Sequence, residues 1–136
     1  MSSAFLIDTN HLGAVATPGH PIRTALIGRA NAGDRFGTCI PVICELEAGI
    51  QQTRNPQGYR QELSSISRYV RTWPLSNETA EIFGQLWISL RQRGRFLSQV
   101  DVMLAALAIQ LDLTLLSTDK DFDALPQVRR ENWIGT

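Results

Sequence analysis

Short, unbroken apolar runs are the clearest feature of the hydropathy pattern along the chain. Residues 4–7 are apolar without the alternation of a half-buried strand, residues 113–116 are apolar apart from Thr114, and residues 36–40 form a third short segment of strand type. Uninterrupted apolar strands are typical of a sheet that helices cover on both faces, and such sheets are mostly parallel. These runs therefore predict buried parallel strands.

Apolar residues at helical spacing occupy most of the chain between these strands. The predicted helices span residues 10–16, 22–30, 41–52, 59–70, 77–90 and 98–111. Pro41 suits the first turn of its helix, and Ser76 or Asn77 and then Ser98 are candidate N-caps of the last two. A short extended segment at 72–75 and an edge strand within 128–134 complete the pattern. The alternation predicts a three-layer α/β/α sandwich with a mostly parallel central sheet.

The length of 136 residues is that of one ordinary domain, which at this size buries about two thirds of its unfolded surface. No apolar run is long enough to span a bilayer. The first residues, Met1-Ser2-Ser3, lack the basic region of a signal peptide. We therefore expect a cytoplasmic protein with no membrane partner.

The two cysteines, Cys39 and Cys44, lie in apolar surroundings. The two histidines, His11 and His20, do not form a metal-ligand pattern with them, so zinc is not supported. The pattern predicts two buried free thiols.

Four carboxylates belong to separate elements, and three of them follow the end of a strand. Asp8 comes directly after the first strand, Glu45 lies in the first turns of the helix after the second, and Asp119 follows the last apolar strand. Asp101 lies on an apolar helix whose alanines on the same face allow a close approach to the sheet. Since ligands bind at the carboxyl edge of such sheets, we expect the four to meet there. Alternatively, Asp8 only caps the helix that follows it.

Clustered carboxylates repel one another and need a cation. Oxygen ligands suit Mg²⁺ or Mn²⁺, which keep several waters and leave positions open for phosphate oxygens. The corresponding chemistry is phosphodiester cleavage by a metal-activated water. Neither a Ser-His-Asp set nor a Cys-His pair stands out as a nucleophile. The sequence also lacks the glycine-rich nucleotide-binding motifs.

The charge balance bears on the substrate. Thirteen basic and thirteen acidic residues give a net charge of zero, which by itself argues against a nucleic-acid partner. However, twelve of the basic residues are Arg, which grips phosphate bidentately and stacks on bases. The basic turn with Arg91, Arg93 and Arg95 is a candidate RNA contact. It equally suits a helix C-terminus, where positive charge complements the dipole.

Four segments of the chain resemble, in order, the acidic motifs of PIN-domain ribonucleases. The segments are residues 5–10, 42–49, 101–106 and 115–122. Their order and spacing and the overall length are similar to those of the VapC group of toxin–antitoxin toxins. The resemblance covers essentially the whole chain, so residues 1–136 are expected to form a single PIN-like nuclease domain.

This resemblance implies a Mg²⁺-dependent endoribonuclease, usually a homodimer, that a co-expressed VapB-type antitoxin holds inactive. Carried over by motif, the catalytic, metal-binding acids are Asp8, Glu45, Asp101 and Asp119. The supporting polar residues are Asn10, Thr118 and Asp121, the last of which shares or takes the role of Asp119.

Three other functions fit parts of the pattern. A haloacid-dehalogenase-type phosphatase also begins with an apolar strand and an Asp, but it needs a second Asp where this chain has Asn10. It also needs a well-placed Lys, and Lys120 is the only lysine in this chain. A PIN-type RNA-processing nuclease without an antitoxin would share the acidic motifs. A non-catalytic α/β module that binds RNA or protein would use its acids only as caps and surface charge.

Overall fold

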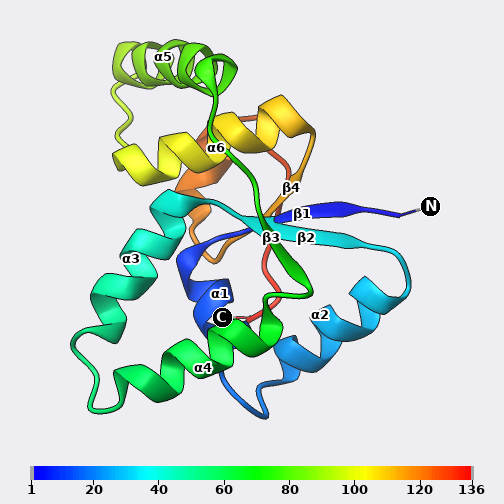
Figure 1. Cartoon of the computed structure of the whole chain (residues 1–136). Helices are drawn as coiled ribbons and strands as arrows, with labels where there is room; N and C mark the ends of the chain where they lie inside the picture. Colours follow the sequence, from blue (N-terminus) through cyan, green and yellow to red (C-terminus); the bar gives the residue numbers. More distant parts are fainter. Residues whose placement is uncertain (1, 136) are drawn as a thin grey trace.

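A five-stranded parallel sheet forms the centre of the fold in the computed structural model, which describes residues 2–135 (Figure 1). The strand order is β3-β2-β1-β4-β5, and every neighbouring pair is parallel. The strands are β1 Ala4–Ile7, β2 Arg35–Thr38, β3 Val70–Thr72, β4 Thr114–Leu116 and β5 Arg130–Glu131. The predicted fold class is confirmed, and the predicted edge strand is β5.

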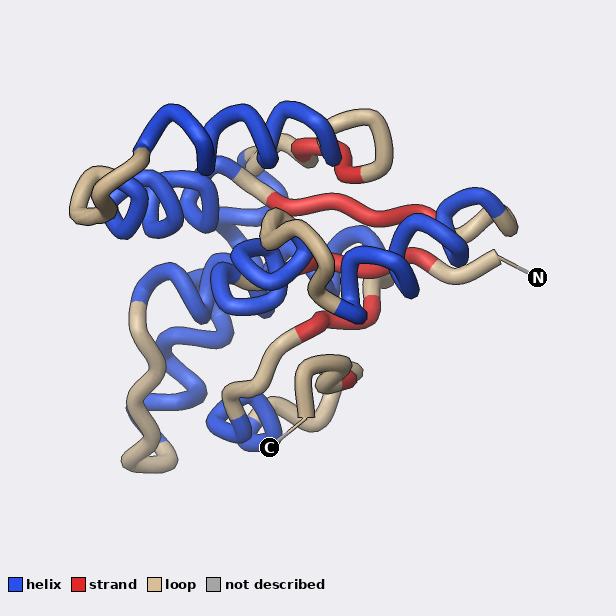
Figure 2. The backbone as a smooth tube through the Cα atoms, turned by 90° about the horizontal axis from the view of Figure 1, so that it is seen from below, coloured by secondary structure: helices blue, strands red, loops and turns tan. Residues whose placement is uncertain are grey.

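Helices lie on both sides of this sheet. They are α1 Thr9–Val15, α2 Pro21–Asn31, α3 Ile40–Ile50, α4 Pro56–Ile66, α5 Asn77–Gln92 and α6 Gln99–Leu111, followed by the 3₁₀ helix η1 Lys120–Ala124. Figure 1 shows α5 and α6 above the sheet and α1, α2 and α4 below it. Figure 2 shows the strands running through the middle of the molecule among these helices. This is the three-layer arrangement that the alternating pattern predicts.

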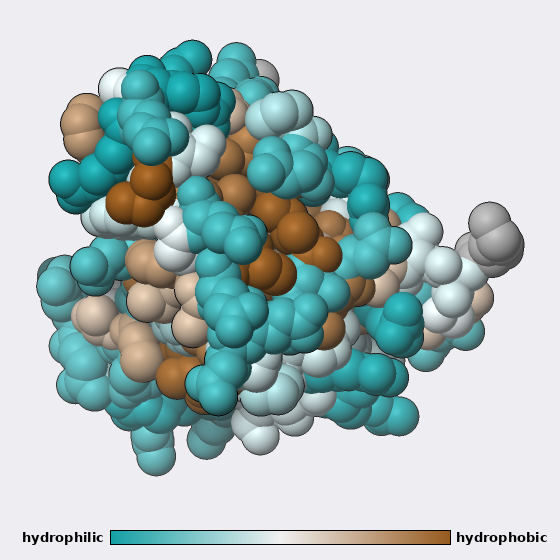
Figure 3. Space-filling model, turned by 90° about the horizontal axis from the view of Figure 1, so that it is seen from above, coloured by the Kyte–Doolittle hydropathy of each residue, from teal (hydrophilic) through white to brown (hydrophobic). Residues whose placement is uncertain are grey.

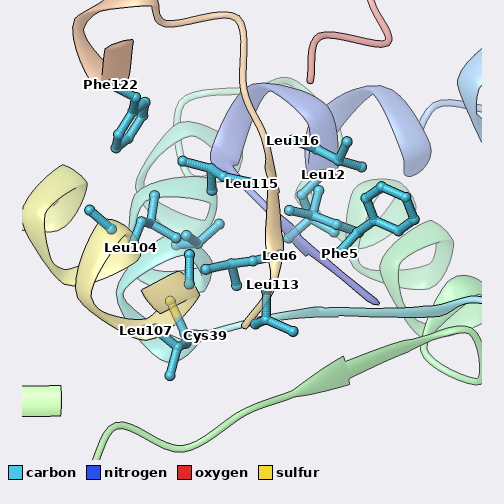
Figure 4. Close-up of a cluster of buried hydrophobic side chains, with 14 of the residues drawn as sticks. Phe5, Leu6, Leu12, Cys39, Leu104, Leu107, Leu113, Leu115, Leu116 and Phe122 are labelled. Atoms are coloured by element: carbon cyan, nitrogen blue, oxygen red, sulfur yellow. The ribbon is translucent and has the colours of Figure 1, made fainter. Parts of the chain in front are cut away.

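The core lies where the central strands meet the helices on either side. Leu6 and Ile7 of β1 and Leu115 and Leu116 of β4 are fully buried. Figure 4 shows how leucines of α6 and of these strands pack against one another. Each such side chain contributes about 1.5–3 kcal/mol through burial. The absence of alternation in the strands therefore has the expected cause, because both faces of the sheet are covered.

Local signals explain where the helices begin. The Ser76 hydroxyl accepts a hydrogen bond from the Thr79 backbone N–H at the start of α5, and the Thr79 hydroxyl accepts one from the Ser76 backbone N–H. Ser98 accepts from the Asp101 backbone N–H at the start of α6, with an N–O distance of 3.1 Å. Each cap satisfies a backbone donor that has no partner within its helix. Both serines thus occupy cap positions that the sequence predicted.

The prediction for residues 59–70 was wrong at both ends. Asn55 caps α4 and Pro56 lies in its first turn, so the helix begins before Tyr59. It ends at Ile66, because Val70 pairs with Phe36 as the first residue of β3.

Two predictions of buried side chains were also wrong. Cys39 is buried, but Cys44 is exposed because it lies on the outer side of α3, while Val42 and Ile50 face the core. On α6, the apolar spacing predicted a buried stripe of Val100, Met103, Leu104, Leu107 and Leu111. Instead, residues 102 and 104–108 are buried and Leu111 is exposed. The buried face is broader than the predicted stripe because α6 packs against both α5 and β4.

The surface seen from above is largely hydrophilic around an apolar region (Figure 3). Exposed apolar side chains include Ile88 on α5 and Phe96 in the loop after it. Among the helices of residues 2–135, none has the length and apolar character needed to cross a membrane.

Candidate active site

An open pocket of about 310 Å³ lies at the carboxyl edge of the sheet. Its lining residues are Asp8, Thr9, Asn10, Glu45, Asp101, Leu104 and Asp119. Parallel strands direct their carboxyl ends, and the residues that follow them, to one edge. The four acids named from the sequence therefore meet in one pocket, although they belong to four separate parts of the chain.

Asp8 is positioned by β1 and by the start of α1. Its backbone N–H donates to the Leu116 carbonyl of β4 at 3.1 Å, and its Oδ1 accepts from the His11 backbone N–H at 2.9 Å. The residue is 9% exposed. Asp8 is therefore the N-cap of α1 and also a wall of the pocket, so the two alternative interpretations of this residue describe one arrangement.

Glu45 reaches the pocket from the first turns of α3. Its Oε1 accepts a hydrogen bond from the Thr9 hydroxyl, with an O–O distance of 2.7 Å. Sequence reasoning missed Thr9, whose only signal was its place between two pocket residues. Thr9 ties Glu45 to the element that carries Asp8.

Asp101 lies in the first turn of α6, next to the Ser98 cap. Burial raises the pKa of its carboxyl to about 6, and the nearby carboxylates of Asp119, Glu45 and Asp8 add to the rise. A hydrogen bond from the Ser98 side chain offsets part of this effect. The raised pKa is the expected electrostatic result of crowding carboxylates in a half-buried pocket.

Asp119 lies directly before η1. Its Oδ1 accepts from the Asp121 backbone N–H at 2.8 Å, while its own N–H donates to the Ser117 hydroxyl at 3.0 Å. Asp121 itself is exposed and does not line the pocket. Of the two fourth-motif acids, Asp119 is thus the one beside the other carboxylates. Sequence reasoning missed the bond to Ser117, which joins residues only two positions apart.

Asn10 and Thr118, two of the three predicted supporting residues, contact each other. The side-chain amide of Asn10 donates to the Thr118 hydroxyl at 3.4 Å. This bond links α1 to the loop between β4 and η1, the elements that follow the two central strands. It connects the segments that carry Asp8 and Asp119.

The three arginines of the basic turn have different surroundings. The guanidinium of Arg91 lies over the Trp87 ring at 4.8 Å and the Phe96 ring at 5.9 Å. Arg93 donates to the Ala124 carbonyl at 2.8 Å, so it holds η1. The side chain of Arg95 is exposed. In this turn, Arg93 therefore makes a structural contact with η1, whereas the guanidinium of Arg95 is exposed to solvent.

The donor set of the pocket fits a hard divalent cation. The side chains that line it carry carboxylate, hydroxyl and amide oxygens, and Mg²⁺ binds through one or two carboxylates while keeping several waters. Within residues 2–135, no group of three or more His, Cys, Asp or Glu side chains is placed so that it could hold a metal ion by itself. The chemistry of the donors thus matches a hydrated Mg²⁺ better than a fully enclosed ion.

Comparison with known proteins adds independent information. A family model described as PIN domain matches residues 5–128. Ribonuclease VapC5 of Mycobacterium tuberculosis is 28% identical over 94 residues, which cover 68% of this chain and 70% of the relative. The structure of VapBC2 from Rickettsia felis, bound to a DNA fragment from its promoter, matches with a TM-score of 0.85 at 21% identity, covering 96% of this chain and 98% of that one. VapBC-5 of M. tuberculosis, a member of the VapBC family of toxin-antitoxin systems, matches with a TM-score of 0.70 at 26% identity and the same coverage.

Proposed function

The chain belongs to the PIN-domain family, as its four acidic motifs predicted, and we propose that it is a Mg²⁺-dependent endoribonuclease, the toxin of a type II toxin–antitoxin system. The observation that carries this proposal is the meeting of four carboxylates in one open pocket at the carboxyl edge of the sheet. The similarity to a VapC ribonuclease supports RNA as the substrate. Residues 1–136 would act as one nuclease domain.

Asp8, Glu45, Asp101 and Asp119 would hold the cation, directly or through its waters. When bound, Mg²⁺, or Mn²⁺ in its place, would supply an activated water and neutralise charge on the phosphate. The pKa of the Asp101 carboxyl is raised to about 6, so this group would serve as a ligand only at a pH at which it has lost its proton. Thr9 would keep the Glu45 carboxylate turned toward the pocket.

Asn10 and Thr118 would act together. Their hydrogen bond would help to hold together the segments after β1 and β4, which carry Asp8 and Asp119. The exposed basic turn before α6, which carries Arg91, Arg93 and Arg95, would bind RNA phosphates. The pocket is open, which favours single-stranded or loop RNA, since the bases and backbone of such RNA are exposed and can be splayed out.

Cleavage of purified RNA tests the enzymatic proposal. We expect wild-type protein to cut single-stranded RNA with Mg²⁺ or Mn²⁺, and EDTA or the substitution Asp8→Asn to abolish cleavage. Asp121→Asn is the matched control, because Asp121 is an exposed acid outside the pocket. It should retain activity. RNA left intact by wild-type protein under all these conditions would favour a non-catalytic binding module.

The proposed inhibitor is a VapB-type antitoxin whose C-terminal segment folds along a groove beside Glu45. An apolar cavity of about 150 Å³ lies between α1, α3 and α4, and Leu12, Ile43 and Leu63 are among the residues that line it. A flexible peptide that orders on binding can cover such a surface despite the cost of ordering. A guanidinium on the same peptide could reach the carboxylates and displace the cation.

Growth assays test the toxin role separately from the nuclease. Expression of wild-type protein alone should arrest growth, and co-expression of the adjacent small protein should restore it. Asp8→Asn should not arrest growth at the same expression level. Unimpaired growth with soluble, RNA-cleaving wild-type protein would instead indicate a PIN-type RNA-processing nuclease. Light scattering of the purified protein tests the expected homodimer.

A further inference from the structure

His11 is a fully buried polar residue next to the pocket, and the proposed chemistry does not use it. Its side chain is 0% exposed. Its Nδ1 lies 3.2 Å from Asp8 Oδ1, and its Nε2 lies 3.0 Å from the backbone nitrogen of Trp133. The imidazole therefore joins a pocket carboxylate to the C-terminal segment, 122 positions away along the chain.

The two hydrogen bonds define the tautomer of this ring. A backbone N–H can only donate, so Nε2 of His11 must offer its lone pair to Trp133. The proton of the neutral ring is then on Nδ1, where it is donated to Asp8 Oδ1. The same oxygen also accepts from the His11 backbone N–H. Oδ1 is thereby saturated, which leaves Oδ2 as the Asp8 oxygen available to the pocket.

We propose that His11 is a positioning residue, held in one tautomer by the Trp133 backbone, which orients the Asp8 carboxylate so that Oδ2 faces the pocket. The proposal rests on the nuclease function for its catalytic consequence, but the tautomer and the orientation do not depend on it. A histidine that only filled the core would need hydrogen-bond partners for its nitrogens, but neither partner would have to be a carboxylate that lines the pocket, as Asp8 is.

The contacts of the Trp133 side chain explain why its backbone N–H stays in position to donate to His11. The indole packs edge-on against Phe5 at 5.2 Å and Phe36 at 5.8 Å between ring centres. The guanidinium of Arg29 lies 4.9 Å from the ring, and the indole N–H donates to Glu131 at 3.0 Å. Contacts on several sides of the ring hold the amide against His11.

Two substitutions separate the two hydrogen bonds of the His11 bridge, one to Asp8 and the other to Trp133. In His11→Asn, the side-chain amide can take the place of Nδ1 and donate to Asp8, but it cannot reach Trp133. In His11→Gln, the longer side chain can accept from Trp133 but no longer places a donor on Asp8. Each variant loses one buried hydrogen bond, so a purely structural role predicts similar behaviour. A positioning role predicts that only the Gln variant is strongly impaired.

The tautomer is measured first, on metal-free wild-type protein, by long-range ¹⁵N–¹H correlation of the imidazole. We expect a protonated Nδ1 and an unprotonated Nε2 for His11. A proton on Nε2, or on both nitrogens, would overturn the proposal whether or not any variant folds.

Calorimetry with Mn²⁺ and RNA cleavage then test the role of the bridge. We expect His11→Gln to lose about 10–100-fold in Mn²⁺ affinity and in kcat, as is usual when a partner of a metal ligand is removed. KM should stay unchanged, since His11 does not touch RNA. His11→Asn should stay within a few-fold of wild type. His20→Gln, at the only other histidine, is the control.

Equal losses in the Asn and Gln variants, or no loss in either, would refute the positioning role. If the wild type binds Mn²⁺ but cleaves no RNA, the nuclease proposal fails instead. The difference in Mn²⁺ affinity between the two variants then still decides the role of His11.

Discussion

Replacement of Asp101 by Asn should stabilise the metal-free protein at neutral pH and weaken cation binding. The pKa of Asp101 rises from 3.8 to about 6, first because of burial and then because of Asp119. The folded state therefore disfavours the carboxylate form more than the unfolded chain does. Stability is lost as the pH rises from about 3.8 through about 6, and Asn removes that loss because it carries no charge.

The size of the effect follows from the pKa. A rise from 3.8 to about 6 sets a ceiling of about 3 kcal/mol, at about 1.4 kcal/mol per pKa unit. Asp101 is only half-buried, so solvent screening reduces the expected gain to about 1–2 kcal/mol. For a domain of this length the gain corresponds to a rise in Tm of roughly 3–8 °C. At pH 4.5 the gain should fall to roughly a third of its value at pH 7.5.

Urea unfolding in EDTA at pH 4.5 and 7.5 measures the free energy of unfolding of both proteins. Asp121→Asn is the control, since an exposed acid outside the pocket should change stability by less than about 0.5 kcal/mol. Saturating Mn²⁺ should reverse the order at pH 7.5, because binding adds about 2.7 kcal/mol at a hundredfold excess over Kd. An Asn variant that is no more stable, or that gains equally at both pH values, would refute the electrostatic reasoning.

Three further outcomes follow from packing, burial and charge. Gly37→Ala should lower the free energy of unfolding in urea by about 1–3 kcal/mol, because a Cβ there would overlap the Trp73 ring. An unchanged midpoint would mean that the indole moves aside at no cost. Iodoacetamide should label the native protein at Cys44, which is exposed, and spare Cys39, which is buried and whose thiol pKa is raised by burial. Mass spectrometry of the labelled peptides shows which thiol reacts, and equal labelling would contradict the described packing. Arg95→Ala should weaken RNA binding and reduce the slope of log Kd against log salt by about one if Arg95 contacts a phosphate, whereas an unchanged slope would exclude that contact.

Local sequence determined most of the elements and several of the caps that begin them. The apolar run from Ala4 to Ile7 ends at Asp8, and the structure has β1 over those four residues with Asp8 directly after it. Ser76 and Ser98 cap α5 and α6. These features depend on neighbouring residues, since a cap and a strand end are made by groups only a few positions apart. The alternation of strands and helices likewise implied a parallel sheet and a shared carboxyl edge.

Only the tertiary structure decided which faces are covered and which distant groups meet. The broad buried face of α6 comes from contact with both α5 and β4, a fact that the spacing of its own residues does not contain. The bonds from Thr9 to Glu45 and from Trp133 to His11 span 36 and 122 positions. Such pairs depend on strand order and on the return of the C-terminal segment along β4. The sequence could therefore name the acids of the pocket, whereas the groups that orient them appear only when the chain has folded.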